Sequence, residues 1–476
     1  MTVSPCSAKF SISNQELYQF LVKNRAYCVN NSCTKIASIA LEIDLVDPLL
    51  VFQKLAISNQ LNFYWENPSK HEAIAAIDAV KKLKVEGKER FYNAEKFVKY
   101  NLSTIINFCN VNHLFSKPLF FCSFSFFDTI IQQNYPFYPA TIFLPKWQIS
   151  RKDKRCILTA NILINKYLNI ESFLQNLWQK ITDINNFNNL KYDFVTLDDS
   201  RPQFIKNSIT KPSKFKLSVL SALKDIRKGH YSKIVLADAL KIQSSIPLDL
   251  FKSLNNLRQL HPNCCIFSTS NGKGQNFIGA SPETLIAIRN QKLITDALAG
   301  SAARGKTTEE DAKNANLLLN NEKERHEHSL VIDFITQKLI ALGLLPQVST
   351  PRLRQLSNIQ HLWTPIIAKA PRNVHPLQIV AHLHPTPAMA GVSPEVACKE
   401  IRRYENFERG LYAAPLGWID SEGNCEFVVG IRSALIDTST KSSLLYAGAG
   451  IVPGSDPEKE FAEIQLKLQA LLEALV

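Results

Sequence analysis

Residues 264–301, CCIFSTSNGKGQNFIGASPETLIAIRNQKLITDALAGS, contain the pattern that most clearly predicts the fold. Short apolar segments at 264–270, 275–279 and 284–289 are separated by Gly, Asn and Pro, which indicates a meander of strands. Helical and strand patterns are mixed around this meander rather than strictly alternating. The sequence therefore predicts an α+β core of antiparallel sheets.

Predicted helices and a further strand surround the meander. The periodicity of apolar residues predicts helices over residues 215–228, 247–261 and 307–342 and a strand over 233–240. Capping-box spacings begin two helices: Thr307 with Glu310, and Ser455 with Glu458 before a C-terminal helix that ends at residue 472.

The first half of the chain ends in a polar stretch. Before that stretch, the hydrophobic pattern predicts strands at 140–145 and 156–163 and helices at 70–84 and 170–181. Residues 181–213 are rich in Asn, Asp and Ser and form the best candidate boundary. We therefore divide the chain into an N-terminal portion, residues 1–207, and a second region, residues 208–476.

Composition indicates a large globular protein. The chain has 476 residues, 45% of them hydrophobic, and lacks the run of about 18 apolar residues that a membrane span needs. Its most apolar window, residues 115–127, is expected to form buried strands. The N-terminus has no secretory-signal pattern, and ten scattered cysteines show neither zinc nor disulfide spacing. These features predict a cytoplasmic protein that does not enter membranes.

The net charge of +13 raises a nucleic-acid hypothesis. The basic residues are dispersed in short groups, such as 81–84, 151–155 and 211–216, and no nucleic-acid module is present. We therefore expect solvated basic faces, no nucleic-acid partner, and an attraction for small anionic substrates.

Two small-residue segments are suited to close contact with a ligand. Gly-Ala-Ser-Pro-Glu, residues 279–283, presents the carboxylate of Glu283, and Ala-Leu-Ala-Gly-Ser, residues 297–301, follows as a predicted turn. Glycine and serine let peptide N–H groups point at an anion. From these residues alone, an ordinary hairpin with an exposed glutamate explains the pattern equally well.

Two glutamate pairs suggest a metal site. Glu324 and Glu327 are three residues apart on one predicted helix, and Glu460 and Glu463 have the same spacing on another. Residues at this spacing share a helix face, and Mg²⁺ prefers carboxylate oxygens. A single pair of this kind is more commonly a solvated surface feature, so the hypothesis requires the two pairs to meet.

Other motifs lie in the second region. Leu-His-Pro-Thr-Pro-Ala, residues 383–388, is a loop stiffened by two prolines, and Ala-Gly-Ala-Gly, residues 447–450, is predicted to form a glycine turn. Arg432 closes an apolar strand, where an arginine either pairs with a buried carboxylate or binds that of a ligand. His326 and His328 are expected to be hydrogen-bonding neighbours, because Mg²⁺ does not favour imidazole.

In their order along the chain, these motifs resemble those of the chorismate-binding enzymes, most closely the isochorismate synthases. They are GASPE, ALAGS, NEKERHEH, LHPTPA, GWIDSEGN, VVGIR, AGAGIVPGS and a closing E-x-x-E-x-x-x-K helix. The resemblance is strong over about 208–476 and weak upstream, where FYWE at 63–66 matches but CSFS at 122–125 replaces expected glycines. It implies one large unit of two packed antiparallel sheets flanked by helices, with strands contributed by the N-terminal portion.

The resemblance also implies roles for individual residues. Glu327 and Glu463 would bind Mg²⁺ directly, and Glu324 and Glu460 would support it through water. The metal would hold the ring carboxylate of chorismate.

The remaining implied residues bind or transform the substrate. Arg432, with the N–H groups around Gly448 and Gly450, would hold the second carboxylate. The rest of the implied pocket consists of Gly300, Ser301, His361 and Lys467. Lys233 matches the family's general base and Glu283 its general acid.

These residue types suit the isomerisation of chorismate to isochorismate. Water adds at C2 while the C4 hydroxyl leaves, so one group must accept a proton and another must donate one. A lysine can act as the base only when it is neutral, and a glutamate can act as the acid only when burial raises its pKa. Asp238 stands where the family commonly has arginine, which casts doubt on a local ion pair but not on the base.

The sequence also separates branches of the family. Ala299 stands where aminodeoxychorismate synthases carry an attacking lysine, and no glutaminase of the anthranilate synthase type is recognisable. Salicylate synthase remains an alternative, because it shares the base and acid and then eliminates pyruvate. Anthranilate synthase component I is a further alternative, and a basic binding protein on an inactive enzyme fold is the non-enzyme one.

The expectation is therefore a Mg²⁺-dependent isomerase acting on chorismate, as a monomer or weak homodimer without a glutaminase subunit. Menaquinone or phylloquinone synthesis is the favoured pathway.

Overall fold

The computed structural model describes residues 8–109, 111, 113–187 and 203–475. The candidate boundary at 181–213 lies partly outside these ranges, as does the beginning of the N-terminal sequence. Over the described ranges, no helix is both long enough and apolar enough to cross a membrane.

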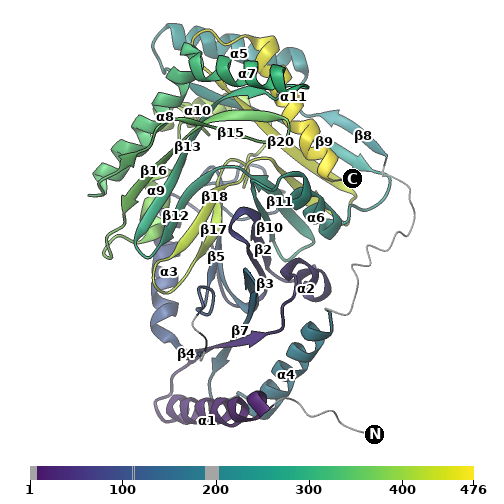
Figure 1. Cartoon of the computed structure of the whole chain (residues 1–476), viewed down its shortest axis with the longest axis vertical. Coiled ribbons are helices and arrows are strands. Elements are labelled where there is room, and N and C mark those ends of the chain that lie inside the picture. Colours follow the sequence, from purple (N-terminus) through teal and green to yellow (C-terminus); the bar gives the residue numbers. More distant parts are fainter. Residues whose placement is uncertain (1–7, 110, 112, 188–202, 476) are drawn as a thin grey trace.

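Antiparallel strands dominate the fold. The 20 strands in the described ranges form one hydrogen-bonded network, which branches at β6 (Ala140–Lys152). One edge of β6 pairs with β3 (Glu72–Val85), and β5 (Phe120–Phe124) and β7 (Arg155–Ile164) share the other. Two arms diverge from this branch (Figure 1). The predicted α+β class with antiparallel sheets is confirmed, and the two sheets are arms of one network.

The first arm continues from β3 and mixes strands of both halves of the chain. Its strands, in spatial order, are β2 (Asn62–Asn67), β10 (Cys265–Ser270), β11 (Gln275–Ser281), β19 (Ser433–Asp437), β20 (Ser442–Ile451), β9 (Ile234–Ser244) and β8 (Phe204–Ser208). Trp65 of β2 lies opposite Phe267 of β10, and both side chains are buried. The FYWE motif thus joins the N-terminal portion to the second region.

The second arm continues from β5. Its strands are β17 (Pro415–Ile419), β18 (Cys425–Val429), β12 (Thr284–Arg289), β13 (Lys292–Ala303) and β16 (Ile359–Lys369), with β14 (Gln347–Val348) and β15 (Arg352–Gln355) on the outer edge of β16. On the far side of the branch, β7 pairs with β1 (Lys35–Ile43), and β1 with β4 (Ile105–Cys109) is the one parallel pair among the described strands.

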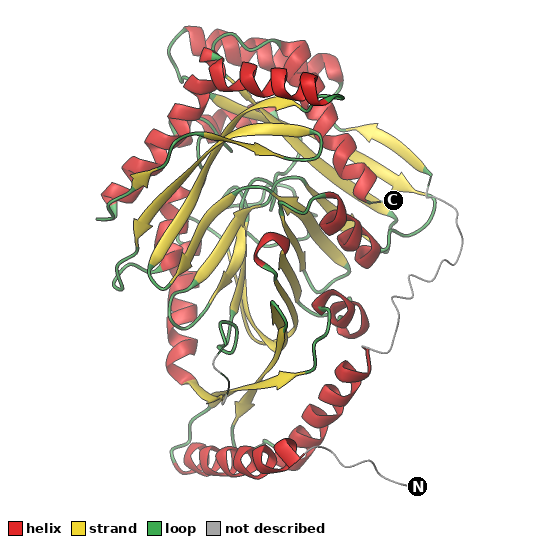
Figure 2. Cartoon of the chain, in the orientation of Figure 1, coloured by secondary structure: helices red, strands yellow, loops and turns green. Residues whose placement is uncertain are grey.

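Helices lie around the outside of the strand network (Figure 2). They are α1 (Ala8–Asn30), α2 (Pro48–Leu55), the 3₁₀ turn η1 (Pro68–Lys70), α3 (Arg90–Thr104), α4 (Ile170–Phe187), α5 (Pro212–Arg227), α6 (Leu250–Leu260), α7 (Thr308–Asn320), α8 (Glu322–Ala341), α9 (Pro376–Leu383), α10 (Pro394–Tyr404) and α11 (Pro457–Ala474). Two of these helices pack on strands of different arms: α8 packs on β13 of the second arm, and α11 packs on β20 of the first.

The helical prediction for residues 70–84 is wrong, because this segment forms β3. Its alanines and lysines favour a helix, but β2 and β6 pair with it along both edges, and its first six residues are buried. Pairing with neighbouring strands therefore overrides the local helical propensity.

The single helix predicted at 307–342 is two helices, α7 and α8. Asn321 between them has an extended backbone, and its side chain accepts a hydrogen bond of 3.1 Å from the N–H of Glu324. An asparagine that caps a new helix competes with continuation of the old one. The predicted cap at the start of α7 is confirmed, since Thr307 accepts a hydrogen bond from the N–H of Glu310.

Two other predicted helix starts are displaced. Asp456, not Ser455, caps α11 by accepting from the N–H groups of Glu458 and Lys459. Asp249 caps α6 in the same way, so Pro247 precedes that helix instead of beginning it.

Candidate active site

Two adjacent segments, in which the chain passes from one arm to the other, place Glu283 and Arg432 between the arms. The chain passes from the first arm to the second at Pro282 and Glu283, between β11 and β12, and returns at residues 430–432, between β18 and β19. The crossings are tied by hydrogen bonds from Val429 N to Glu283 O (3.2 Å) and from Ala280 N to Arg432 O (3.1 Å). Glu283 and Arg432 are therefore held beside each other's chain segments although they are far apart in sequence.

A cavity of about 250 Å³ opens between the arms. It is lined by strands of both arms and by residues of α8 and α11. The predicted site residues that line it are Glu283, Gly300, Ser301, Glu324, Glu327, His361, Arg432, Gly448, Gly450, Glu460, Glu463 and Lys467. The fold thus brings together residues that the sequence spreads over nearly two hundred positions.

Lys233 is the predicted site residue that does not line this cavity. It directly precedes β9, is fully buried, and has its Nζ 2.8 Å from Glu327 Oε1, an ion-pair contact without hydrogen-bond geometry. Glu327 does line the cavity. The lysine therefore lies in contact with the cavity wall, through Glu327.

Glu283 is a buried carboxyl group with little to stabilise its charge. Only 1% of the residue is exposed, and neither carboxyl oxygen has a hydrogen-bond partner among the described residues. Burial and the charge of Asp296 raise its pKa to about 8, although Lys233 and Arg354 act in the opposite direction. Glu283 consequently keeps its proton at neutral pH, as a general acid must.

The two glutamate pairs meet, as the metal hypothesis requires. Glu324 and Glu327 come from α8, Glu460 and Glu463 come from α11, and all four line the cavity. Lys323 contacts both helices' carboxylates, lying 3.6 Å from Glu324 and 3.2 Å from Glu460.

Ser301 and Lys467 also bind these carboxylates. Ser301 donates its N–H to Glu324 (3.0 Å) and its hydroxyl to Glu463 (2.9 Å). Lys467 lies 2.6 Å from Glu463 and also donates to the carbonyl of Gly448 (2.8 Å).

Burial is the main influence on the pKa values of these groups. Burial and the charge of Glu327 raise the pKa of Glu324 to about 7, and burial raises that of Glu460. Burial acts in the same direction on Glu463, but Lys467 and Ser301 outweigh it and its pKa is lowered. In the described ranges, no three His, Cys, Asp or Glu side chains converge as metal ligands would.

Arg432 is a half-buried cation that lines the cavity. Its Nη2 lies 3.3 Å from His361 Nε2, whose ring contacts the carbonyl of Gly300 through Nδ1 (3.3 Å). Its Nη1 has no hydrogen-bond partner among the described residues, and its backbone has a φ of 49°. A strained backbone that holds an unsatisfied guanidinium in a cavity is suited to binding a ligand carboxylate.

The glycine segments are strands, not the predicted turns. Residues 297–301 belong to β13, with an irregular register at Gly300, and residues 447–450 belong to β20. A Cβ at Gly450 would lie 2.5 Å from Glu327 Oε1, and one at Gly448 would lie 2.9 Å from the Tyr412 hydroxyl. Because these glycines have no side chain, Glu327 and the Tyr412 hydroxyl can occupy the space beside them.

The two histidines of NEKERHEH differ. His328 is buried and contacts the Thr364 hydroxyl at 2.8 Å, while His326 is exposed to solvent. The prediction that both are hydrogen-bonding neighbours in the site is therefore wrong for His326.

The structure also adds cavity residues that sequence reasoning did not single out. Lys323 and Lys459 flank the glutamates, and Met389 and Tyr412 line the wall. Lys323 stands inside the NEKERHEH motif and could have been found there, whereas no motif marked Tyr412.

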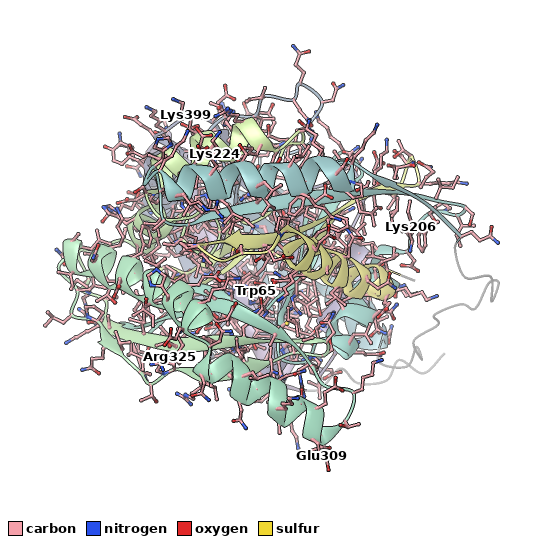
Figure 3. All side chains as sticks on the ribbon, turned by 90° about the horizontal axis from the view of Figure 1, so that it is seen from above. Trp65, Lys206, Lys224, Glu309, Arg325 and Lys399 are labelled. Carbon is pink, nitrogen blue, oxygen red and sulfur yellow. The ribbon has the colours of Figure 1, made fainter. Side chains whose placement is uncertain are left out.

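Basic residues are exposed on several parts of the surface. Figure 3 shows Lys206, Lys224 and Lys399 pointing outward from different elements, with Trp65 in the interior. This distribution is that of dispersed, solvated charge.

Comparison with known proteins agrees with the geometry of the cavity. The family described as chorismate binding enzyme matches residues 22–476. This chain belongs to that family. The predicted membership of the family, and with it an enzymatic function, is confirmed.

Its relatives include isochorismate synthases. Isochorismate synthase MenF of Bacillus subtilis is 30% identical over 451 residues, which cover 92% of this chain and 93% of the relative. The salicylate biosynthesis isochorismate synthase of Pseudomonas aeruginosa is 39% identical over 258 residues, about half of each chain (54% and 53%).

Solved structures share the fold. The menaquinone-specific isochorismate synthase MenF of Escherichia coli has a TM-score of 0.76 at 24% identity and covers 93% of this chain and 95% of its own. Anthranilate synthase component I of Streptococcus pneumoniae has a TM-score of 0.66 at 19% identity, over 84% of this chain and 92% of its own. The architecture that the resemblance implied, one large unit of antiparallel sheets flanked by helices, is confirmed and is shared with anthranilate synthase component I.

Proposed function

We propose that this chain is an isochorismate synthase, a hydroxymutase that isomerises chorismate to isochorismate. One observation carries the proposal: Glu283, a buried carboxyl group that keeps its proton at neutral pH, lines the same cavity as the unsatisfied guanidinium of Arg432. The MenF relative from Bacillus subtilis, which matches nearly the whole chain, supports the same activity.

The carboxylate oxygens of the cavity are of the type that Mg²⁺ prefers, although no three of these groups converge among the described residues. Four glutamates of two helices line one space, and burial together with the charge of Glu327 raises the pKa of Glu324, which supports a cation beside them. We propose Glu327 and Glu463 as the direct ligands, with Glu324 and Glu460 acting through water. When bound, Mg²⁺ would hold the ring carboxylate of chorismate.

The remaining steps belong to side chains of the protein. Lys233 accepts a proton from the water whose oxygen bonds to C2. The ring double bonds shift, the C4–O bond breaks, and Glu283 gives its proton to the departing hydroxyl, which leaves as water. Arg432 binds the enolpyruvyl carboxylate, with the segment around Gly448 and Gly450 beside it.

Water should be the only nucleophile that this enzyme uses. Ala299 offers no amine for attack on the ring, and no glutaminase that would supply ammonia is recognisable in this sequence, so ammonium salts should yield no anthranilate or amino-chorismate product. Chromatography after incubation with chorismate, Mg²⁺ and ammonium checks this result. An aminated product formed at a rate comparable to isochorismate would move the chain to the anthranilate branch, and salicylate with pyruvate would identify a salicylate synthase.

We further propose a cytoplasmic enzyme that supplies quinone synthesis. The two MenF-named proteins support a menaquinone pathway. Phylloquinone synthesis needs the same precursor.

A further inference from the structure

The segment that joins the two arms and contains Glu283 is hydrogen-bonded immediately before and after Glu283. Both partners are residues that do not line the cavity. Asp296 on β13 accepts the N–H of Thr284 (3.0 Å), directly after Glu283. Arg354 on β15 donates to the carbonyl of Pro282, directly before it. The peptide groups that flank Glu283 are thus bound by two strands of the second arm.

Asp296 and Arg354 also form an ion pair with each other. Arg354 Nη1 lies 3.1 Å from Asp296 Oδ2, and Trp363 on β16 donates its Nε1–H to Asp296 Oδ1 (2.8 Å). The guanidinium of Arg354 stacks 4.7 Å from the centre of the Trp363 ring. Asp296 is buried, and its oxygens accept from three donors, so its position is closely determined.

The charges of this pair act on a carboxyl group that has no hydrogen-bond partner in the described part of the chain. Asp296 opposes ionisation of Glu283, while Arg354 favours it. The other charged group that acts on Glu283 is Lys233, in front of β9. Charged groups elsewhere on the same cavity are Glu324 and Glu327 of α8, Glu460 and Glu463 of α11, Arg432, Lys323, Lys459 and Lys467.

We propose that Asp296 and Arg354 are positioning residues for Glu283, because they fix its backbone from both sides and place a pair of opposite charges against that segment. This inference rests on the proposed role of Glu283 as the general acid. Neither residue belongs to the motifs that define the candidate site, and neither lines the cavity.

The proposal predicts shifts of opposite sign in the pH profile. Activity falls at high pH as Glu283 loses its proton. Asp296→Asn removes the negative charge that raises the pKa of Glu283. The alkaline limb of the pH profile of kcat should therefore move to lower pH by about one unit. Arg354→Gln removes the positive charge, so the same limb should move to higher pH. Asp296→Glu keeps the charge and should restore the limb toward its wild-type position.

A merely structural role gives a different result. It would lower kcat at every pH and leave the limb in place, or move it in the same direction in both variants, and either result would overturn the proposal. Circular dichroism checks folding, and if Asp296→Asn does not fold, the alkaline shift in Arg354→Gln decides alone.

The proton on Glu283 can also be followed without turnover. The infrared C=O stretch of the buried carboxylic acid, identified by its absence in Glu283→Gln, should disappear near pH 8 in the wild type and at lower pH in Asp296→Asn. If this band shifts but chorismate is not converted, the proposed function fails and the positioning role stands. If chorismate is converted but neither band nor limb moves, the positioning role is wrong and the function stands.

Discussion

Lys233→Ala and Glu283→Gln should each lower kcat by roughly 10²–10⁴-fold, the usual contribution of a positioned base or acid. The two groups act on different protons, one taken from the attacking water and one given to the departing hydroxyl, so neither replaces the other. KM should change much less, because the substrate carboxylates are bound by other groups. Steady-state kinetics on chorismate measures both quantities.

Matched variants control for general effects of substitution. Lys241→Ala changes an exposed lysine of β9, the strand that follows Lys233, and Glu309→Gln changes an exposed glutamate, so both should retain wild-type kcat. If Lys233→Ala keeps more than about a third of wild-type kcat, far above the loss expected for a general base, Lys233 has a structural role.

The pH dependence should report the proton on Glu283. Glu283 must be protonated and its pKa is about 8, so activity should be present below this pH and decline as the pH rises through it. The residual activity of Lys233→Ala should keep this alkaline decline, because Glu283 is unchanged in that variant.

Removal of Mg²⁺ should abolish turnover, and Glu327→Gln or Glu463→Gln should have the same effect while the fold remains intact. Either substitution removes one carboxylate from the four cavity glutamates of α8 and α11, and a hard cation depends on that negative charge. Kinetics in excess EDTA, with Mg²⁺ added back, measures the first effect. Full activity in excess EDTA would exclude the metal assignment.

A binding measurement separates metal binding from the contacts that these glutamates already make. Glu327 is paired with Lys233, and Glu463 is bound to Ser301 and Lys467, so a loss of activity has two possible origins. Binding of Mn²⁺, followed by electron paramagnetic resonance, should weaken in both variants. Glu322→Gln, an exposed position on α8, should bind the metal as the wild type does.

Much of the site could be predicted because its motifs are local in sequence. Glu283 stands in GASPE and Glu327 in NEKERHEH, and the spacing of each glutamate pair already places its members on one helix face. The meeting of the two pairs also followed from the resemblance, since spacing alone says nothing about how α8 and α11 approach each other.

The features that escaped prediction depend on contacts between distant segments. Residues 70–84 have helical propensity but are fixed as a strand by pairing on both edges. The partners of the proposed general acid, Asp296 and Arg354, are 13 and 71 residues from Glu283 and carry no motif of their own. Only the crossing of the chain between the arms brings them to it.

The most direct test of the central claim is the fate of isotopically labelled water. The purified chain is incubated with chorismate and Mg²⁺ in H₂¹⁸O, and isochorismate from early time points, before the reverse reaction contributes, is analysed by mass spectrometry with fragmentation. Addition of water at C2 predicts one ¹⁸O atom per molecule of isochorismate, located in the C2 hydroxyl. Isochorismate that carries only ¹⁶O, or no isochorismate at all, would contradict the account.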